Sequence, residues 1–379
     1  MNADAALLEI VRSYFDEVMY ALLDFRLSIE APNGPNGFPH PAHLRGVAAR
    51  LDPSSQTIVR LFRLGEPVDG ADVERAIPSA ALDAFQGTGL LVRDAAGWRT
   101  PNLVLVPLEG LLILASTPAS YPTSTGPCSV WFDLSSYAIA RALPGSLRGA
   151  RVLDICSGTG IQSLLCAARG AAGTVGLEIS GPAVEVARIN ALLNGAGAAA
   201  EFRRSDGLAA LGDDERFDFV VCNTPYAPVL DRDQAPASAD AVGNSLLFKV
   251  LERLPDHLSP RASGILASWR SPGRGASSWH SERLAARLAA MDASMVTFQD
   301  RAPDTLEGVI KILRGDLEPR LAPDDMAAVV AAAERVLRDG GAATEGFFNE
   351  VITFRRGSGS ERRVRRLREP AAAAPGARV

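Results

Sequence analysis

The sequence has no long uninterrupted apolar run. The longest such stretch, residues 103–115, is broken by Pro107 and Glu109, whereas a membrane-spanning helix needs roughly 20 consecutive apolar residues. The N-terminus carries Asp4 and Glu9 and lacks the basic start and small-residue cleavage site of a secretory signal. We therefore expect a protein without a membrane span that works in the cytoplasm.

Cysteine and histidine are also sparse. The four cysteines, residues 128, 156, 166 and 222, show no short paired spacing, so neither a zinc site nor a disulfide framework is indicated. The four histidines have no metal-ligand spacing, and no Gly-x-Ser-x-Gly or other nucleophile signature occurs. We expect an activity that needs no metal and no serine or cysteine nucleophile.

Positive charge is limited. Lys249 and Lys311 are the two lysines, and 39 basic residues face 44 acidic ones, for a formal net charge of -5. Because duplex binding is dominated by basic side chains that meet phosphates, this balance argues against a broad nucleic-acid footprint. The exception is the arginine-rich tail, residues 357–379, which we expect to be disordered and either solvated or in contact with an anionic partner.

The first 120 residues predict a smaller, mostly helical domain. Apolar residues recur at three- and four-residue steps from Ala5 to Leu27, which predicts one amphipathic helix. Three short helices and two strands should follow in the order of a winged helix, at residues 54–64, 69–77, 78–86, 89–93 and 103–106.

The predicted third helix of this group is where a winged helix would read DNA. Its exposed side chains are Ser79, Asp83 and Gln86, and it carries no Arg or Lys. Because phosphate contacts supply most of the affinity of such modules, the sequence argues against DNA binding. We expect the domain to cap a substrate pocket or to mediate homodimerisation. A cofactor-sensing DNA-binding regulator is the non-enzymatic alternative.

From Arg151 onward, short apolar runs alternate with longer helical patterns. This alternation is typical of a doubly wound parallel sheet. Residues 121–356 are therefore predicted to form an α/β domain with a Rossmann-like, seven-stranded sheet. Its strands are expected at residues 152–155, 173–177, 200–203, 217–222, 264–269, 294–299 and 347–354.

The first of these strands ends in an acid and a glycine-rich turn. Asp154 precedes the turn that contains Ser157, Gly158 and Gly160, and the two glycines let the backbone approach a ligand closely. A dinucleotide site would add a third glycine and place a pyrophosphate at the helix N-terminus. The acid repels a pyrophosphate but suits the cationic amino group of a methionine moiety, so an adenosyl amino acid fits better.

Two further strand ends supply candidate cofactor ligands. After the second strand, Glu178 lies where an acid can accept both ribose hydroxyls, and Ile179 follows it. After the third strand, Asp206 and Gly207 place a short acid near where an adenine amino group would lie, although an ordinary Asx turn explains this pair equally simply.

The fourth strand runs into Asn223, Thr224, Pro225 and Tyr226. This tetrapeptide resembles the Asn-Pro-Pro-Tyr motif of class I S-adenosylmethionine-dependent methyltransferases that methylate nitrogen, in the small-methyltransferase-domain family. The resemblance covers Arg151 to about Leu266. It implies S-adenosyl-L-methionine as cofactor and four candidate catalytic residues.

Each residue of the tetrapeptide receives a role from the resemblance. Asn223, also a cofactor neighbour, and the Thr224 carbonyl would orient the target nitrogen, Pro225 would fix the turn, and Tyr226 would wall the acceptor pocket. In-line displacement on a sulfonium depends mainly on how the lone pair of the target nitrogen is oriented toward the methyl group. The departure is Thr224 in place of the first proline, so the glutamine or adenine substrates of the parent enzymes do not simply transfer.

These observations predict an N-methyltransferase that acts on a small amine- or amide-bearing molecule, in specialised metabolism. Two alternatives use the same cofactor. One is a cyclase that turns the cofactor's amino group on its own aminobutyl carbons and releases methylthioadenosine. The other is methylation of a nitrogen in a protein or an RNA.

Overall fold

The computed structural model describes residues 1–30, 40–117, 134–224, 245–270, 279–299, 323–337, 348–357 and 362–366, with a few single positions. The chain divides into two compact units. The first contains Met1–Ala140 and Pro144–Asp206, and the second contains Arg141–Leu143 and Gly207–Val379. The N-terminal helices therefore belong to the same unit as the first strands of the α/β part.

The N-terminal segment forms two helices, α1 (Ala5–Glu17) and α2 (Tyr20–Glu30), and the prediction of one helix through residue 27 was wrong. Met19 separates them with a φ of +50°, a conformation that ends a right-handed helix. Apolar residues keep their helical spacing across this break because both helices pack on one core. The pattern alone therefore hides the turn.

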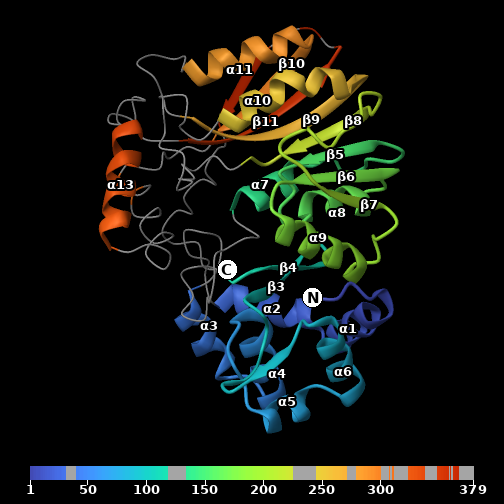
Figure 1. The fold of residues 1–379 in the computed structure, drawn as a ribbon, viewed down its shortest axis with the longest axis vertical. Coiled ribbons are helices and arrows are strands. Elements are labelled where there is room, and N and C mark those ends of the chain that lie inside the picture. Colours follow the sequence, from blue (N-terminus) through green and yellow to red (C-terminus); the bar gives the residue numbers. More distant parts are fainter. Residues whose placement is uncertain are drawn as a thin grey trace, which may run out of the picture. The chain divides into compact units, whose positions relative to one another are not determined.

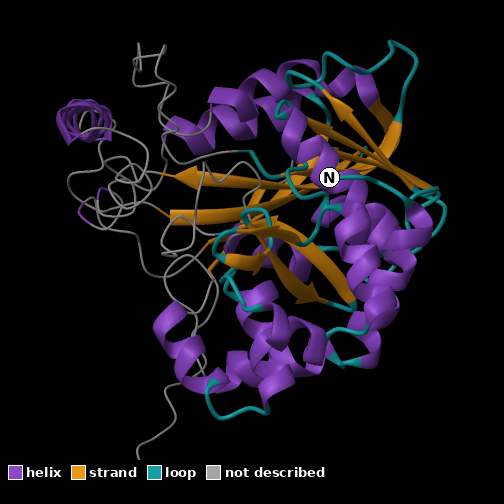
Figure 2. Ribbon diagram, turned by 60° about the horizontal axis from the view of Figure 1, so that its bottom comes forward, coloured by secondary structure: helices purple, strands orange, loops and turns teal. Residues whose placement is uncertain are grey.

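The rest of residues 1–117, called the N-terminal domain below, is a group of short helices followed by hairpins. Figure 2 shows its largely helical character. Val68 pairs with Trp98 beside the small β1–β2 hairpin. Strand β3 pairs with β4, so the two strands expected at residues 89–93 and 103–106 lie in different hairpins. The elements are α3 (Pro41–Ala48), α4 (Pro53–Ile58), the π-helix η1 (Val59–Arg63), α5 (Gly70–Ala76), α6 (Ser79–Thr88), β1 (Val92–Asp94), β2 (Gly97–Arg99), β3 (Leu103–Leu108) and β4 (Leu111–Ser116).

The α/β part of the first unit consists of three parallel strands. They are β5 (Arg151–Ile155), β6 (Gly173–Glu178) and β7 (Ala200–Arg204), in the order β5-β6-β7. Helix α7 (Leu134–Ala142) precedes them, and α8 (Ile161–Ala168) and α9 (Gly181–Leu193) connect them.

One hydrophobic core joins the N-terminal helices to α9. Within it, Phe15 packs edge-to-face against both Phe62 and Phe85, whose own rings are tilted by 31° relative to each other. Val186 and Ile189 of α9 belong to the same core, and Figure 1 shows α9 beside β4. The N-terminal domain is thus built directly onto the helix that follows β6.

The described residues of the second unit form five strands in the order β8-β9-β11-β10-β12, of which β8 and β9 are parallel and β11 is antiparallel to both of its neighbours. The seven predicted strands are all present, so the predicted fold class is confirmed. The elements are β8 (Phe217–Cys222), α10 (Ser245–Arg253), the 3-10 helix η3 (Leu254–His257), β9 (Leu258–Arg270), α11 (Trp279–Ala290), β10 (Ala293–Gln299), α13 (Pro323–Leu337), β11 (Phe348–Arg356) and β12 (Arg362–Arg366).

Strand β12 differs from the prediction of a disordered tail after residue 357. Residues 362–366 pair in parallel with β10, for example Thr297 with Val364. Backbone pairing with an open strand edge needs no apolar side chains, and basic residues are common at sheet edges. In the part of the chain that the structure describes, no helix has the length and apolar content of a membrane span.

Candidate functional site

The turn after β5 is bent by three left-handed residues in five positions. Cys156, Gly158 and Gly160 have φ values of +59°, +50° and +78°. Glycine adopts this conformation freely, whereas a cysteine there carries local strain. The two glycines were predicted from the sequence, whereas Cys156 was not, because a left-handed cysteine has no local sequence signal.

Gly160 is required by packing as well as by its backbone angle. A Cβ at this position would lie 2.6 Å from Cζ of Phe202, and a Cβ at Gly176 in β6 would lie 2.5 Å from Cδ1 of the same ring. The Phe202 ring, which comes from β7, therefore occupies the space that the two glycines leave. This contact holds the start of α8 close to the strands.

Asp154 is fully buried at the end of β5. Its Oδ2 accepts hydrogen bonds from the backbone N–H (2.9 Å) and the hydroxyl (2.8 Å) of Ser163. The pKa of Asp154 is raised to about 7, mainly by burial and in smaller part by the charge of Glu178, while the two hydrogen bonds from Ser163 act in the opposite direction. A cation bound at this turn would favour the ionised carboxylate.

Several buried polar atoms at this turn have no hydrogen-bond partner among the described residues. They are Oδ1 of Asp154, Oγ of Ser157, Oγ1 of Thr159 and Oε1 of Gln162. A buried polar group without a partner costs about 1–3 kcal/mol. Four of them within nine residues indicate a place where a polar ligand supplies the missing partners.

Glu178, at the end of β6, is tied to the same turn. Its Oε2 accepts from the N–H of Gly158 (3.0 Å), and its Oε1 accepts from the N–H of Ser180 (2.9 Å). A carboxylate has about four lone-pair sites, so both oxygens can still accept from a ligand's hydroxyls. Ile179, next along the chain, is 61% exposed and offers an apolar surface beside this carboxylate.

The structure brings six predicted residues together at the carboxyl ends of β5 and β6, namely Asp154, Ser157, Gly158, Gly160, Glu178 and Ile179. Asp206 is exposed just after β7, where the N–H of Ser205 donates to the carbonyl of Glu178. The cofactor-binding roles of all these residues stay predictions.

The remaining predicted residues belong to the second unit or lie outside the described residues. Gly207 has a φ of +56°, and Asn223 and Thr224 follow β8 directly. Asn223 is half-buried, whereas Thr224 is buried and its Oγ1 has no partner among the described residues. Pro225 and Tyr226 lie outside the residues that the structure describes.

Comparison with known proteins finds a family model that matches a segment of the α/β part. The family model "Methyltransferase small domain" matches residues 128–239. These residues are similar to the methyltransferase small domain. This match includes the glycine-rich turn, the end of β6 and the tetrapeptide after β8. A second model, a domain of unknown function (DUF7059), matches residues 37–101 in the N-terminal domain.

The curated relatives are named for the methylation of glutamine. The chain is 31% identical over 121 residues to a ribosomal protein uL3 glutamine methyltransferase of Bradyrhizobium diazoefficiens, a match that covers 29% of this chain and 38% of that protein. It is 31% identical over 113 residues to a candidate protein N5-glutamine methyltransferase of Methanocaldococcus jannaschii, covering 28% of this chain and 55% of that protein. The chain thus spans at most about half the length of these relatives.

Among solved structures, the chain aligns with a ribosomal protein L11 methylase of Lactobacillus delbrueckii subsp. bulgaricus. The alignment has 18% identity and a TM-score of 0.31, and it covers 43% of this chain and 71% of that chain.

Proposed function

We propose that this protein is an S-adenosylmethionine-dependent methyltransferase that methylates a planar amide or amine nitrogen. The observation that carries the proposal is the turn after β5. Four of its buried polar atoms have no hydrogen-bond partner among the described residues, and its backbone N–H at Gly158 donates to the Glu178 carboxylate. Such a set of acceptors beside an acid fits the hydroxyls and the ammonium group of an adenosyl amino acid.

Residues of the first unit would hold the cofactor, which supplies an electrophilic methyl group on a sulfonium. Glu178 would accept the ribose hydroxyls, and the exposed Ile179 would pack on the base, with Asp206 near its amino group. Asp154 and the turn with Ser157, Gly158 and Gly160 would take the amino-acid end. A buried carboxylate stabilises a cation strongly because water does not screen the pair.

Residues of the second unit would hold the acceptor. The side-chain carbonyl of Asn223 and the backbone carbonyl of Thr224 would accept hydrogen bonds from the acceptor's N–H groups. Pro225 would fix the turn and Tyr226 would form a wall of the acceptor pocket, whereas Gly207 would lie with Asp206 near the cofactor's base. The bound cofactor would supply the methyl group and keep the neutral thioether, and the carbonyls of Asn223 and Thr224 would hold the nitrogen lone pair in line with that methyl. The acceptor nitrogen finally loses a proton to water. Orientation of the lone pair is the main contribution of the chain.

The relatives' names favour an amide as the acceptor. Glutamine carries a planar carboxamide, and a small free amide presents the same group, so both fit the proposed role of Asn223. We take the glutamine side chain of a protein as the first acceptor to test, and the small amine- or amide-bearing molecule as the second. Homodimerisation, cytoplasmic location and a role in specialised metabolism stay predictions of the sequence.

The test is incubation of the full chain with methyl-labelled S-adenosylmethionine and, separately, a glutamine-containing peptide, a small primary amide and a primary amine. We expect label in an amide acceptor and stoichiometric S-adenosylhomocysteine. Methylthioadenosine formed without any acceptor would favour the cyclase instead. Absence of label from every nitrogen acceptor, together with salt-sensitive DNA binding, would favour the regulator and contradict the proposal.

A further inference from the structure

Asn190 of α9 bonds both to the N-terminal domain and to the glycine-rich turn. Its Oδ1 accepts from the N–H of Leu114 in β4 (2.9 Å), and its Nδ2 donates to the carbonyl of Leu114 (3.0 Å) and to the carbonyl of Thr159 (2.9 Å). The side chain is completely buried. Three hydrogen bonds to a fully buried side chain fix this amide in one orientation.

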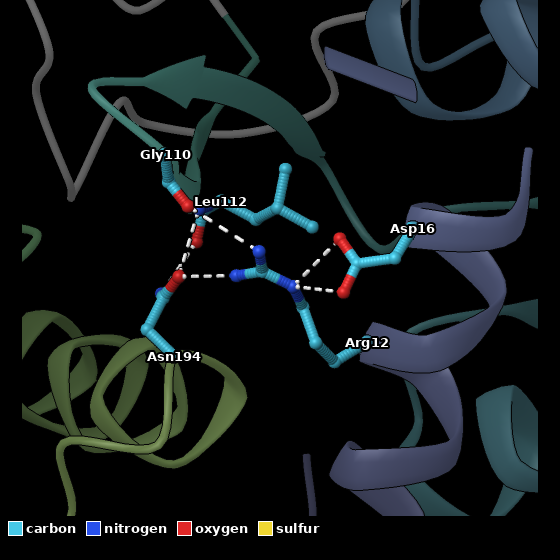
Figure 3. A network of polar contacts seen from close by, with 5 residues as sticks. All are labelled: Arg12, Asp16, Gly110, Leu112 and Asn194. Atoms are coloured by element: carbon cyan, nitrogen blue, oxygen red, sulfur yellow. Dashed lines mark hydrogen bonds and ion pairs between the residues drawn. The ribbon is translucent and has the colours of Figure 1, made fainter. Parts of the chain in front are cut away.

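Asn194, one helical turn later, repeats the pair of hydrogen bonds to β4. Its side chain accepts from the N–H of Leu112 and donates to the carbonyl of Leu112, both at 2.8 Å. Figure 3 shows that Arg12 completes the group, because it donates to Oδ1 of Asn194 (3.0 Å) while it pairs with Asp16 (3.0 Å). Asn194 therefore joins β4 and α1, and its hydrogen bonds to the described residues do not reach the turn after β5.

The two amides match β4 because the spacings of a helix and a strand coincide. Four helical residues rise about 6 Å, and two strand residues advance about 6.6 Å. Asn190 and Asn194 thus meet alternate residues of β4, and their amides pair with its backbone much as a neighbouring strand would. The β3–β4 hairpin is thereby fastened along α9.

The third bond of Asn190 gives it a role that Asn194 lacks. Thr159 lies between the two left-handed glycines, and the peptide group after it is held at both ends. Its carbonyl accepts from Asn190, and its N–H, which belongs to Gly160, donates to the carbonyl of Ser157 (2.7 Å). The bond from Asn190 therefore sets the path of the turn that carries the partnerless acceptors.

We propose that Asn190 is a positioning residue for cofactor binding, through which the N-terminal domain sets the shape of the glycine-rich turn. This inference rests on the proposed function, since the ligand of the turn is taken to be the adenosyl cofactor. Binding at the turn and docking of the β4 hairpin then stabilise each other, because such a coupling is reciprocal.

The test compares Asn190→Ala with Asn194→Ala in the full chain. Both variants lose two hydrogen bonds to β4, so both should unfold at a lower temperature, but Asn190→Ala alone loses the bond to Thr159. We expect calorimetric titration with S-adenosylhomocysteine to show roughly tenfold weaker binding for Asn190→Ala, which corresponds to about 1.4 kcal/mol, because the buried carbonyl of Thr159 loses its partner. For Asn194→Ala we expect less than about twofold change. Equal affinities in the two variants overturn the positioning role.

Wild-type protein provides a second readout that needs no folded variant. Saturation with S-adenosylhomocysteine should slow hydrogen exchange of the Leu114 amide more than that of the Leu112 amide, because only the first is bonded to the residue that holds the turn. Equal slowing of both amides indicates global stabilisation alone and contradicts the inference. If wild-type protein binds no S-adenosylhomocysteine, the proposed function fails, and the inference falls with it.

Discussion

The backbone N–H of Gly158 donates a 3.0 Å hydrogen bond to Oε2 of Glu178, and so the turn after β5 is fastened to the end of β6. The acid at the second strand end is therefore part of the turn's architecture as well as a candidate ligand for ribose. Its other oxygen accepts from Ser180 at the start of α9. One carboxylate thus joins the two segments that would hold the two ends of the cofactor.

Glu178→Gln tests this double role with little change of shape. The glutamine has one acceptor oxygen, and its NH₂ group faces a backbone N–H. Because hydrogen bonds to charged groups are worth about 1.5–3 kcal/mol, we expect roughly tenfold to hundredfold weaker binding of S-adenosylhomocysteine in calorimetric titration. Glu201→Gln is the matched control, since Glu201 is an exposed acid paired with Arg203 on β7. Equal affinity in both variants would refute the role of Glu178.

Gly160→Ala tests the packing of the turn against Phe202. The new Cβ meets the ring at 2.6 Å in a left-handed conformation, so we expect a loss of roughly 2–5 kcal/mol in unfolding free energy, measured by urea denaturation. Gly195→Ala is the control, because Gly195 also has a positive φ but nothing lies within 4 Å of the added Cβ. It should lose only about 1–2 kcal/mol. The same loss in both variants would show that the ring contact is not decisive.

The buried carboxyl of Asp154 predicts a pH dependence of stability. Its pKa rises from 3.8 to about 7 on folding, mainly because of burial, so the folded protein binds more protons between these values. Stability therefore falls as the pH rises through this window and is level above it. Asp154→Asn should remove that component. Urea denaturation of both proteins across the window checks it, and parallel curves would contradict it.

Asn223→Ala tests the acceptor site separately from the cofactor site. We expect kcat for transfer of labelled methyl to fall by about a hundredfold or more, because an unoriented nitrogen loses the proximity advantage. Affinity for S-adenosylhomocysteine should change little, since the residues that would hold most of the cofactor lie in the first unit. Undiminished methyl transfer in this variant would remove Asn223 from the mechanism.

Local features of the candidate site could be predicted from the sequence. A β-strand that ends in Asp154 and runs into Gly158 and Gly160 is a short-range pattern, and the second strand end supplied Glu178 in the same way. The seven strands followed from apolar runs between helical patterns. These features depend on neighbouring residues, so periodicity and spacing reveal them.

Features that depend on distant contacts or single backbone angles could not be predicted. The bond between Asn190 and Leu114 joins residues 76 positions apart, and no periodicity reports such a pair. The turn at Met19 is a single left-handed residue within an unbroken apolar pattern. Strand β12 is fixed by pairing with β10 and not by its own composition.

The most direct test of the account is calorimetric titration of the intact wild-type protein with S-adenosylhomocysteine. The account predicts saturable binding at one site per chain, which Glu178→Gln weakens and Glu201→Gln leaves unchanged. No saturable binding to the wild-type protein, or equal binding by both variants, would contradict the claim that the turn after β5 and the Glu178 carboxylate form the cofactor site.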